Sequence, residues 1–143
     1  MNAVTATEAT PSQAKTRGGA TAYLQVDGAA KAADFYKRAF GAELAAMHPL
    51  DEKGRTMHVH LYVNGTTVML SDFYPEHGQP AVKPQGFTLT VEVDDIEAWW
   101  KRAVDAGVEI LTPPQDMFWG ARFGALCDPF GVNWGFNQPK KIA

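Results

Sequence analysis

"YLQVDGAAKAADFYKRAFGAEL" at residues 23–44 and "LTVEVDDIEAWWKRAVDAGVEI" at residues 89–110 are two versions of one pattern. Each runs from an apolar stretch through Val-Asp to a segment with paired aromatics, then Lys-Arg-Ala, a glycine and a second β-like stretch. Thirteen residues separate Val26 from Ala39 and ten separate Val93 from Ala103, a difference close to one helical turn. An internal repeat of this kind predicts two copies of one structural module.

Each copy predicts an amphipathic helix. Apolar residues recur three and four apart, as on one face of a helix, at Ala32, Phe35, Tyr36, Ala39 and Phe40, and again at Ile96, Trp99, Trp100, Ala103 and Val104. Gly41 and Gly107 stand where a left-handed residue ends a helix, and Asp94 with Glu97 resembles a capping box. The paired aromatics are therefore expected in the core rather than against a cofactor.

Short strands are predicted around each helix. Strands at 21–26 and 87–93 precede the helices. Those that follow are expected at 42–48, 55–63 and 66–72 in the first half and at 108–111, 121–127 and 132–137 in the second. Asn64-Gly65 is typical of a two-residue hairpin turn. Each half is thus βαβββ, which predicts an α+β fold of two modules whose curved mixed sheets form a cleft.

The stretches "VDGAAKAADFYKRAFGAE" (26–43) and "WGARFGALCDPFGVNWGF" (119–136), with the doubled module, resemble the vicinal oxygen chelate superfamily. That superfamily holds glyoxalase I (a lactoylglutathione lyase), extradiol dioxygenases, fosfomycin resistance enzymes and bleomycin resistance proteins, and the likeness is to its PhnB-like branch. The resemblance implies a homodimer and one glyoxalase/bleomycin-resistance domain at 20–138. Its parts would be module 1 at about 20–73, a connecting loop at 74–86 and module 2 at about 87–138, between a flexible tail at 1–19 and a short tail at 139–143.

Family enzymes hold a divalent metal with His and Glu from the first and fourth strands of each module. The resemblance puts these positions at Thr21, Met69, Thr88 and Gly135. None of the four is an ordinary metal ligand. A register shift of two residues would bring Tyr23 or Gln25 opposite Thr90, which also makes no metal site. We therefore expect no metal and no cofactor.

The stretch "MHVHLYV" (57–63) carries the polar groups best placed for a ligand. On a strand, His58, His60 and Tyr62 share one face because side chains alternate. Three interpretations stay open for the histidines: polar lining of a ligand cleft, structural hydrogen bonding, or a displaced metal site with Glu92 as third ligand. One histidine could also serve as a general base.

The stretch "LTPPQDMFWGARFG" (111–124) is predicted to be a stiff loop that presents an aromatic residue beside an arginine to a planar or anionic ligand. The alternative is a structural Asp116–Arg122 pair with Trp119 closing one end of the cleft. The predicted ligand-binding residues are Tyr23, Gln25, His58, His60, Tyr62, Glu92, Asp116, Trp119 and Arg122.

The composition limits which partners and which cellular location we expect for this protein. A net charge of −3 without a basic patch argues against nucleic acid as a partner, and no apolar run approaches the roughly 18 residues of a membrane span. The single cysteine, Cys127, excludes an internal disulfide and a cysteine-rich zinc site. The first residues lack the order of a signal peptide. We therefore expect a cytoplasmic protein that does not associate with membranes.

The function hypothesis is metal-free binding of a small molecule in the cleft. The alternative is a metal-dependent lyase, isomerase or dioxygenase with a displaced site on His58, His60 and Glu92, so enzyme activity stays open. A third hypothesis is a protein-association domain with a vestigial cleft.

Overall fold

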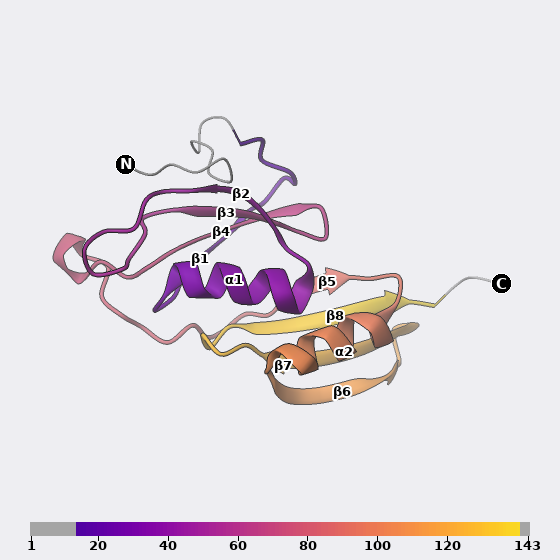
Figure 1. Ribbon diagram of the computed structural model, residues 1–143. Coiled ribbons are helices and arrows are strands. Elements are labelled where there is room, and N and C mark those ends of the chain that lie inside the picture. The colour runs from indigo at the N-terminus through magenta and orange to yellow at the C-terminus, as the bar shows by residue number, and fades with distance from the viewer. Residues whose placement is uncertain (1–13, 141–143) are drawn as a thin grey trace. The chain divides into compact units, whose positions relative to one another are not determined.

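The computed structural model describes residues 14–140, which fall into two compact units (Figure 1). The first unit ends at residue 83 and leaves out residues 38–40, which group with the second unit, from residue 84 onward. Neither of the two α-helices described within residues 14–140 is long and apolar enough to cross a membrane.

The first unit is a four-stranded sheet with one α-helix. Along the chain come β1 (Ala22–Gln25), α1 (Ala29–Phe40), β2 (Glu43–Met47), β3 (Val59–Val63), β4 (Thr66–Ser71) and the short 3-10 helix η2 (Pro75–His77). The strand order is β1-β4-β3-β2. β1 runs parallel to β4 and the other pairs are antiparallel.

The second unit repeats this plan. Its elements are β5 (Leu89–Glu92), α2 (Ile96–Ala106), β6 (Glu109–Met117), β7 (Ala121–Cys127) and β8 (Asn133–Pro139). The strand order, β5-β8-β7-β6, is that of the first sheet, with one parallel pair, β5 and β8. The predicted α+β fold of two βαβββ modules is confirmed.

Alternation along the strands decides which side of each sheet faces its helix. On β3, the side chains of Val59, Leu61 and Val63 are buried and belong to the core between the sheet and α1. Burying one such side chain contributes about 1.5–3 kcal/mol. The other face of each sheet, away from its helix, is called its open face below. On β3 that face carries His60 and Tyr62.

Several turns and caps follow the sequence prediction. Asn64 and Gly65 both have positive φ, 50° and 83°, as a two-residue hairpin between β3 and β4 requires. α1 and α2 end at Gly41 and Gly107, both left-handed. The predicted N-cap is wrong by one residue, because Asp95, not Asp94, accepts a hydrogen bond from the Ala98 backbone N–H (3.1 Å).

Three element boundaries differ from the prediction. β3 begins at Val59, because residues 55–58 are irregular: the Thr56 N–H donates to Asp72 and the Thr56 hydroxyl donates to the His48 carbonyl. β5 begins at Leu89 rather than at residue 87, and Phe87 is 44% exposed. Residues 111–124 are not a loop: β6 and β7 pair through them and leave a short connection at Phe118–Gly120.

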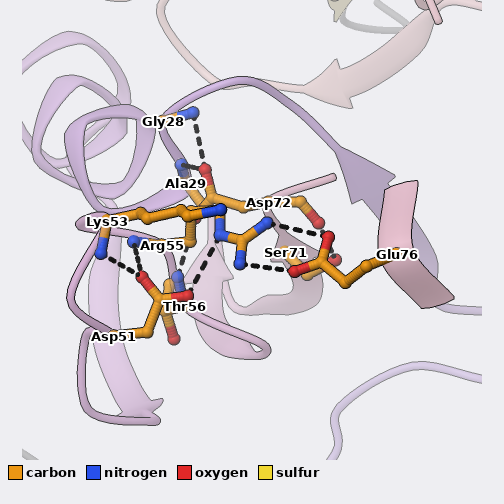
Figure 2. Close-up of polar contacts among 9 residues, drawn as sticks. All are labelled: Gly28, Ala29, Asp51, Lys53, Arg55, Thr56, Ser71, Asp72 and Glu76. Carbon is orange, nitrogen blue, oxygen red and sulfur yellow. Dashed lines mark hydrogen bonds and ion pairs between the residues drawn. The ribbon is translucent and has the colours of Figure 1, made fainter. Parts of the chain in front are cut away.

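Asp72 organises the end of β4 in the first unit (Figure 2). One of its carboxylate oxygens accepts from the backbone N–H groups of Gly28 (2.8 Å) and Ala29 (3.1 Å) at the start of α1, and the other accepts from Thr56 (2.8 Å). The carboxylate thereby supplies the N-terminal cap that Gly28, which has no side chain, cannot provide.

Arg55 makes a second polar cluster close by, also drawn in Figure 2. Its guanidinium donates two hydrogen bonds to Glu76 (2.7 and 3.1 Å) and one to Asp51 (3.0 Å), and it lies over the ring of Tyr74. The bonds to Arg55 hold the pKa of Glu76 at about 2. Asp72 and Arg55 line a pocket of about 410 Å³ at the start of α1, but both are engaged by neighbouring protein groups, so we interpret this region as structural.

Candidate functional site

The open face of the first sheet is built by alternate residues of three strands. The register places Tyr23 of β1 beside Met69 of β4, and Met69 beside His60 of β3. Gln25 lies beside Ser71, and Tyr62 lies beside Thr67. Four of the residues predicted from sequence, Tyr23, Gln25, His60 and Tyr62, therefore share one face, and His58 continues that face just before β3.

His58 is paired with Tyr23 at one end of this face. The Tyr23 hydroxyl lies 2.9 Å from Nδ1 of His58, and their ring centroids are 5.7 Å apart. Burial, together with the nearby charges of His48 and His60, lowers the pKa of His58. A neutral imidazole either donates or accepts a hydrogen bond. Tyr23 is half exposed, so this pair is accessible to a ligand.

His60 lies in a different environment, although it is only two residues away. Its side chain is fully buried, and its Nε2 lies 2.9 Å from the Thr67 hydroxyl. Nδ1 has no hydrogen-bond partner among the described residues. Burial first, and the charge of Arg17 second, lower the pKa of His60. The fold therefore favours a neutral His60.

The described end of the N-terminal segment lies on this face. Lys15 and Arg17 contact Tyr62 and Thr67, and Figure 1 shows the segment, in indigo, on the side of the sheet away from α1. Residues 1–19 were expected to form a flexible tail. Within that range residues 14–19 are described, and they contact two of the open-face residues; residues 1–13 lie outside the described part.

The open face of the second sheet carries a chain of polar contacts. The Trp119 indole N–H donates to Oδ1 of Asn137 (3.1 Å), and the Asn137 amide donates from Nδ2 to Glu92 (2.9 Å). Asn137 stands opposite Glu92 on β5 and Phe123 on β7. The Trp119 and Phe123 rings meet edge to face with centroids 5.7 Å apart. Trp119 and Glu92, both predicted from sequence, are thus brought together through Asn137.

Arg122 and Asp116 are not brought to that face. Nε of Arg122 donates to Glu97 of α2 (3.0 Å), and Asp116 lies directly across from Arg122 in the β6–β7 ladder. The next residue on the same side of β7 is Gly124, where an added Cβ would lie 2.8 Å from the Trp100 ring. Arg122 and Asp116 therefore lie on the helix-bearing side. The Arg122 guanidinium forms ion pairs with both Glu97 and Asp116. We interpret these pairs as structural, as the alternative interpretation predicted.

The chain's own residues do not fit the divalent metal of the family. In the first unit, Met69 is flanked by Tyr23 and His60 rather than by Thr21, so the register follows the two-residue shift considered above. Met69 is not a ligand that such a metal prefers, the Tyr23 hydroxyl is bonded to His58, and the buried His60 is bonded through Nε2 to Thr67.

The second unit fits a metal even less well. At Gly135, an added Cβ would lie 2.7 Å from the Phe123 ring and 3.5 Å from Thr88. The phenyl ring therefore fills the space that a ligand side chain on β8 would need. Within residues 14–140, no group of three His, Cys, Asp or Glu side chains is arranged to hold a metal ion.

Sequence reasoning missed Thr67, Phe123 and Asn137, although period-two alternation alone assigns each to an open face. It also missed Arg17, because an arginine in a polar, non-periodic segment carries no signal of long-range contact. Only the glycine pair that follows, Gly18-Gly19, hints at a bend there; Gly18 has φ 106°.

Known proteins share both the sequence pattern and the fold. Residues 19–136 match the model of the Glyoxalase/Bleomycin resistance protein/Dioxygenase superfamily. The uncharacterized protein Mb0911c of Mycobacterium bovis is 40% identical over 124 residues, which cover 82% of this chain and 80% of that protein.

Two solved structures extend the likeness. The PhnB protein from Bacillus cereus aligns with a TM-score of 0.66 and 25% identity, over 85% of this chain and 99% of its own. TnmS3, an antibiotic binding protein from Streptomyces sp. CB03234, aligns with a TM-score of 0.62 and 28% identity, over 84% of this chain and 93% of its own. With its doubled βαβββ module and this match, the chain belongs to the Glyoxalase/Bleomycin resistance protein/Dioxygenase superfamily.

Proposed function

We propose that this protein binds a small molecule on its open sheet faces without the help of a metal ion. The observation that carries the proposal is the chemistry at the family's metal positions. On the first sheet the register brings Tyr23, Met69 and His60 together, with Tyr23 bonded to His58 and His60 bonded to Thr67, and on the second sheet the Phe123 ring covers Gly135. Binding without metal chemistry agrees with this lining, and the similar TnmS3 is described as an antibiotic binding protein.

The proposed ligand contacts combine aromatic surface with hydrogen-bonding groups. On the first sheet, Tyr23, His58 and Tyr62 offer rings and polar atoms, and Gln25 adds an amide; His60 offers its unpaired Nδ1. On the second sheet, Trp119 and Glu92 are held by Asn137. Sites of this composition suit a partly aromatic ligand that carries polar groups. We further propose that the protein acts as a homodimer, as its family resemblance implies.

A thermal-shift panel tests this proposal. A small-molecule ligand should raise the melting temperature, because binding to the folded state stabilises it. Mn²⁺, Ni²⁺ and Zn²⁺ should not. His58→Ala should reduce the ligand's effect, whereas His77→Ala, which removes an exposed histidine from η2 in the same unit, should leave it unchanged.

Native mass spectrometry of freshly purified protein provides the decisive control. It reports subunit number, retained ligand and bound metal in one measurement. About one divalent ion per chain, lost on His58→Ala, would overturn metal-free binding in favour of the displaced-metal enzyme, which would need both histidines released from Tyr23 and Thr67. Monomers alone would contradict the homodimer.

A further inference from the structure

Residues 15–18 contact the first sheet in the way a bound peptide would. The Tyr62 hydroxyl donates to the carbonyl oxygen of Lys15 at 2.5 Å. The backbone N–H of Arg17 donates to the Thr67 hydroxyl at 2.8 Å, and the Arg17 carbonyl accepts from the Thr67 backbone N–H at 2.9 Å. Thr67 and Tyr62 face each other across β3 and β4, so the segment is held by one cross-strand pair.

The Arg17 side chain adds a further contact of a kind that ligands use. Its guanidinium carbon lies 3.8 Å from the centre of the Tyr62 ring. A planar cation at this distance is attracted by the negative face of the ring and stacks on it. The segment therefore presents two carbonyl acceptors, one N–H donor and a planar cation to the open face.

The backbone at Gly18 makes this approach feasible. Its φ of 106° is one that residues with a side chain rarely adopt, and an added Cβ would lie 3.3 Å from Thr66. The chain turns here between the contacts of Arg17 and the start of β1 at Ala22. Because the parallel pairing of β1 with β4 begins at Ala22 and Val68, the Thr67 N–H is bonded by Arg17 instead of by β1.

Beneath this segment lies a polar group that is not satisfied. His60 is fully buried and bonds through Nε2 to the same Thr67 hydroxyl that accepts from Arg17, while its Nδ1 has no partner among the described residues. Buried polar atoms are normally hydrogen-bonded. A ligand that reached this position could satisfy Nδ1, which the segment does not.

We propose that residues 15–18 form a strap that occupies part of the ligand face, and that a ligand with amide groups and a planar cation competes with it. This inference rests on the proposed function, since it concerns the same face. A ligand must then displace the strap, and its apparent affinity is the intrinsic affinity multiplied by the fraction of molecules in which the face is free. The contacts of the strap, with carbonyl acceptors, an N–H donor and a planar cation, indicate which ligand groups this end of the face binds.

The first test needs no ligand. Arg17→Ala in the full chain should raise the hydrogen-exchange rate of the Thr67 amide on the order of tenfold, because the cation–π contact that holds the strap is lost. Lys83→Ala removes the same charge from the exposed connection after η2 and should leave that rate unchanged. An unchanged Thr67 rate in Arg17→Ala would overturn the strap.

The second test uses the strap's own sequence as the probe. The peptide acetyl-Lys-Thr-Arg-Gly-amide should bind Arg17→Ala several-fold more tightly than wild type and shift the NMR signals of Thr67 and Tyr62. The same peptide with alanine for arginine should bind more weakly. Equal binding of the arginine peptide to wild type and Arg17→Ala, or no binding to either, would overturn the competition.

The two proposals can fail separately. If no small molecule shifts the melting temperature but the exchange and peptide results are as expected, the proposed function fails and the strap stands. If small molecules stabilise wild type and Arg17→Ala to the same extent and the peptide does not discriminate between them, the proposed function stands and the competition fails.

Discussion

The two histidines of "MHVHLYV" show that residue type and spacing do not determine the environment of a side chain. His58 and His60 lie on one face, as their spacing predicts, yet one is accessible beside Tyr23 and the other is fully buried beside Thr67. The spacing determines the face because side chains alternate along a strand. It cannot determine burial, which here comes with contacts to residues far away along the chain, such as Arg17.

The lowered pKa values of His58 and His60 predict an acid-sensitive stability. Both groups have a folded-state pKa below the ordinary 6.5, so the unfolded chain binds more protons once the pH falls below about 6.5. The contribution of these two histidines to the free energy of unfolding should therefore be constant above that pH and fall below it, by at most about 1.4 kcal/mol per pH unit for each histidine. Urea titrations at several pH values measure this.

A variant at His60 measures how much this residue contributes to the pH dependence of the free energy of unfolding. His60→Gln keeps an amide that can bond to the Thr67 hydroxyl but does not titrate, so the slope below pH 6.5 should become smaller. His77→Gln, on the exposed η2, should keep the wild-type slope. A His60→Gln profile identical to wild type would show that His60 titrates equally in the folded and unfolded chain.

Asp72 joins three parts of the first unit: the end of β4, the start of α1 and Thr56. Its carboxylate accepts three backbone N–H groups and is 3% exposed. Asp72→Ala would leave these donors buried without a partner, and we expect a loss of about 3–5 kcal/mol in the free energy of unfolding. Asp72→Asn, which keeps one acceptor oxygen, should cost less. Urea denaturation compares them, and a loss for Asp72→Ala below that of Asp34→Ala, at an exposed position of α1, would contradict this role.

At the scale of elements, the periodic segments were predicted well and the irregular ones poorly. Both helices and their glycine ends follow from local spacing that needs no tertiary information. Residues 111–124 misled the prediction because Pro113-Pro114 normally breaks strands. Here the two prolines lie on β6, at the edge of the sheet, inside a register irregularity between Thr112 and Gln115, where proline is tolerated. Because this segment was expected to be a loop, Arg122 and Asp116 were predicted to contact a ligand, whereas they lie on the helix-bearing side of the sheet.

Gly135 on β8 offers a test of how the second open face is packed. Gly135→Ala should destabilise the protein by about 1–3 kcal/mol, because the new methyl group would lie 2.7 Å from the Phe123 ring. Phe123→Leu should cost less on its own, and the double variant should be more stable than the sum of the two single effects predicts. Strict additivity in this double-mutant cycle would show that the ring does not lie against Gly135.

At the scale of the whole molecule, the repeat extends to the polar groups that hold each unit. Asp72 follows β4 and accepts hydrogen bonds from the start of α1, and Gln138, at the matching position of β8, accepts from the Ile96 N–H at the start of α2 (2.7 Å). The second unit also has a buried carboxylate of its own: Asp128, between β7 and β8, is 4% exposed and accepts from the N–H groups of Phe130 (2.8 Å) and Val132 (3.0 Å) and from the Trp134 indole (2.9 Å). The doubled module was visible in the sequence, because both copies repeat the same order of residue types around the helix, although the first copy is three residues longer. The strap was not, because it follows no part of the repeated pattern, and its contacts through the Arg17 guanidinium and the backbone of Lys15 and Arg17 carry no periodic signal.

Asp128→Ala should therefore loosen the second unit selectively. Three buried donors lose their partner, so we expect faster hydrogen exchange in β7 and β8, while the amides of β3 and β4 stay protected. The last turn of α1 should follow the second unit, because residues 38–40 group with it and the Ala39 carbonyl accepts from Arg102 (3.1 Å). Residue-resolved exchange measures this, with Asp105→Ala at an exposed position of α2 as control. An equal rise in the hydrogen-exchange rates of β3, β4, β7 and β8 would contradict this prediction. It would mean that the two units unfold together as one cooperative block.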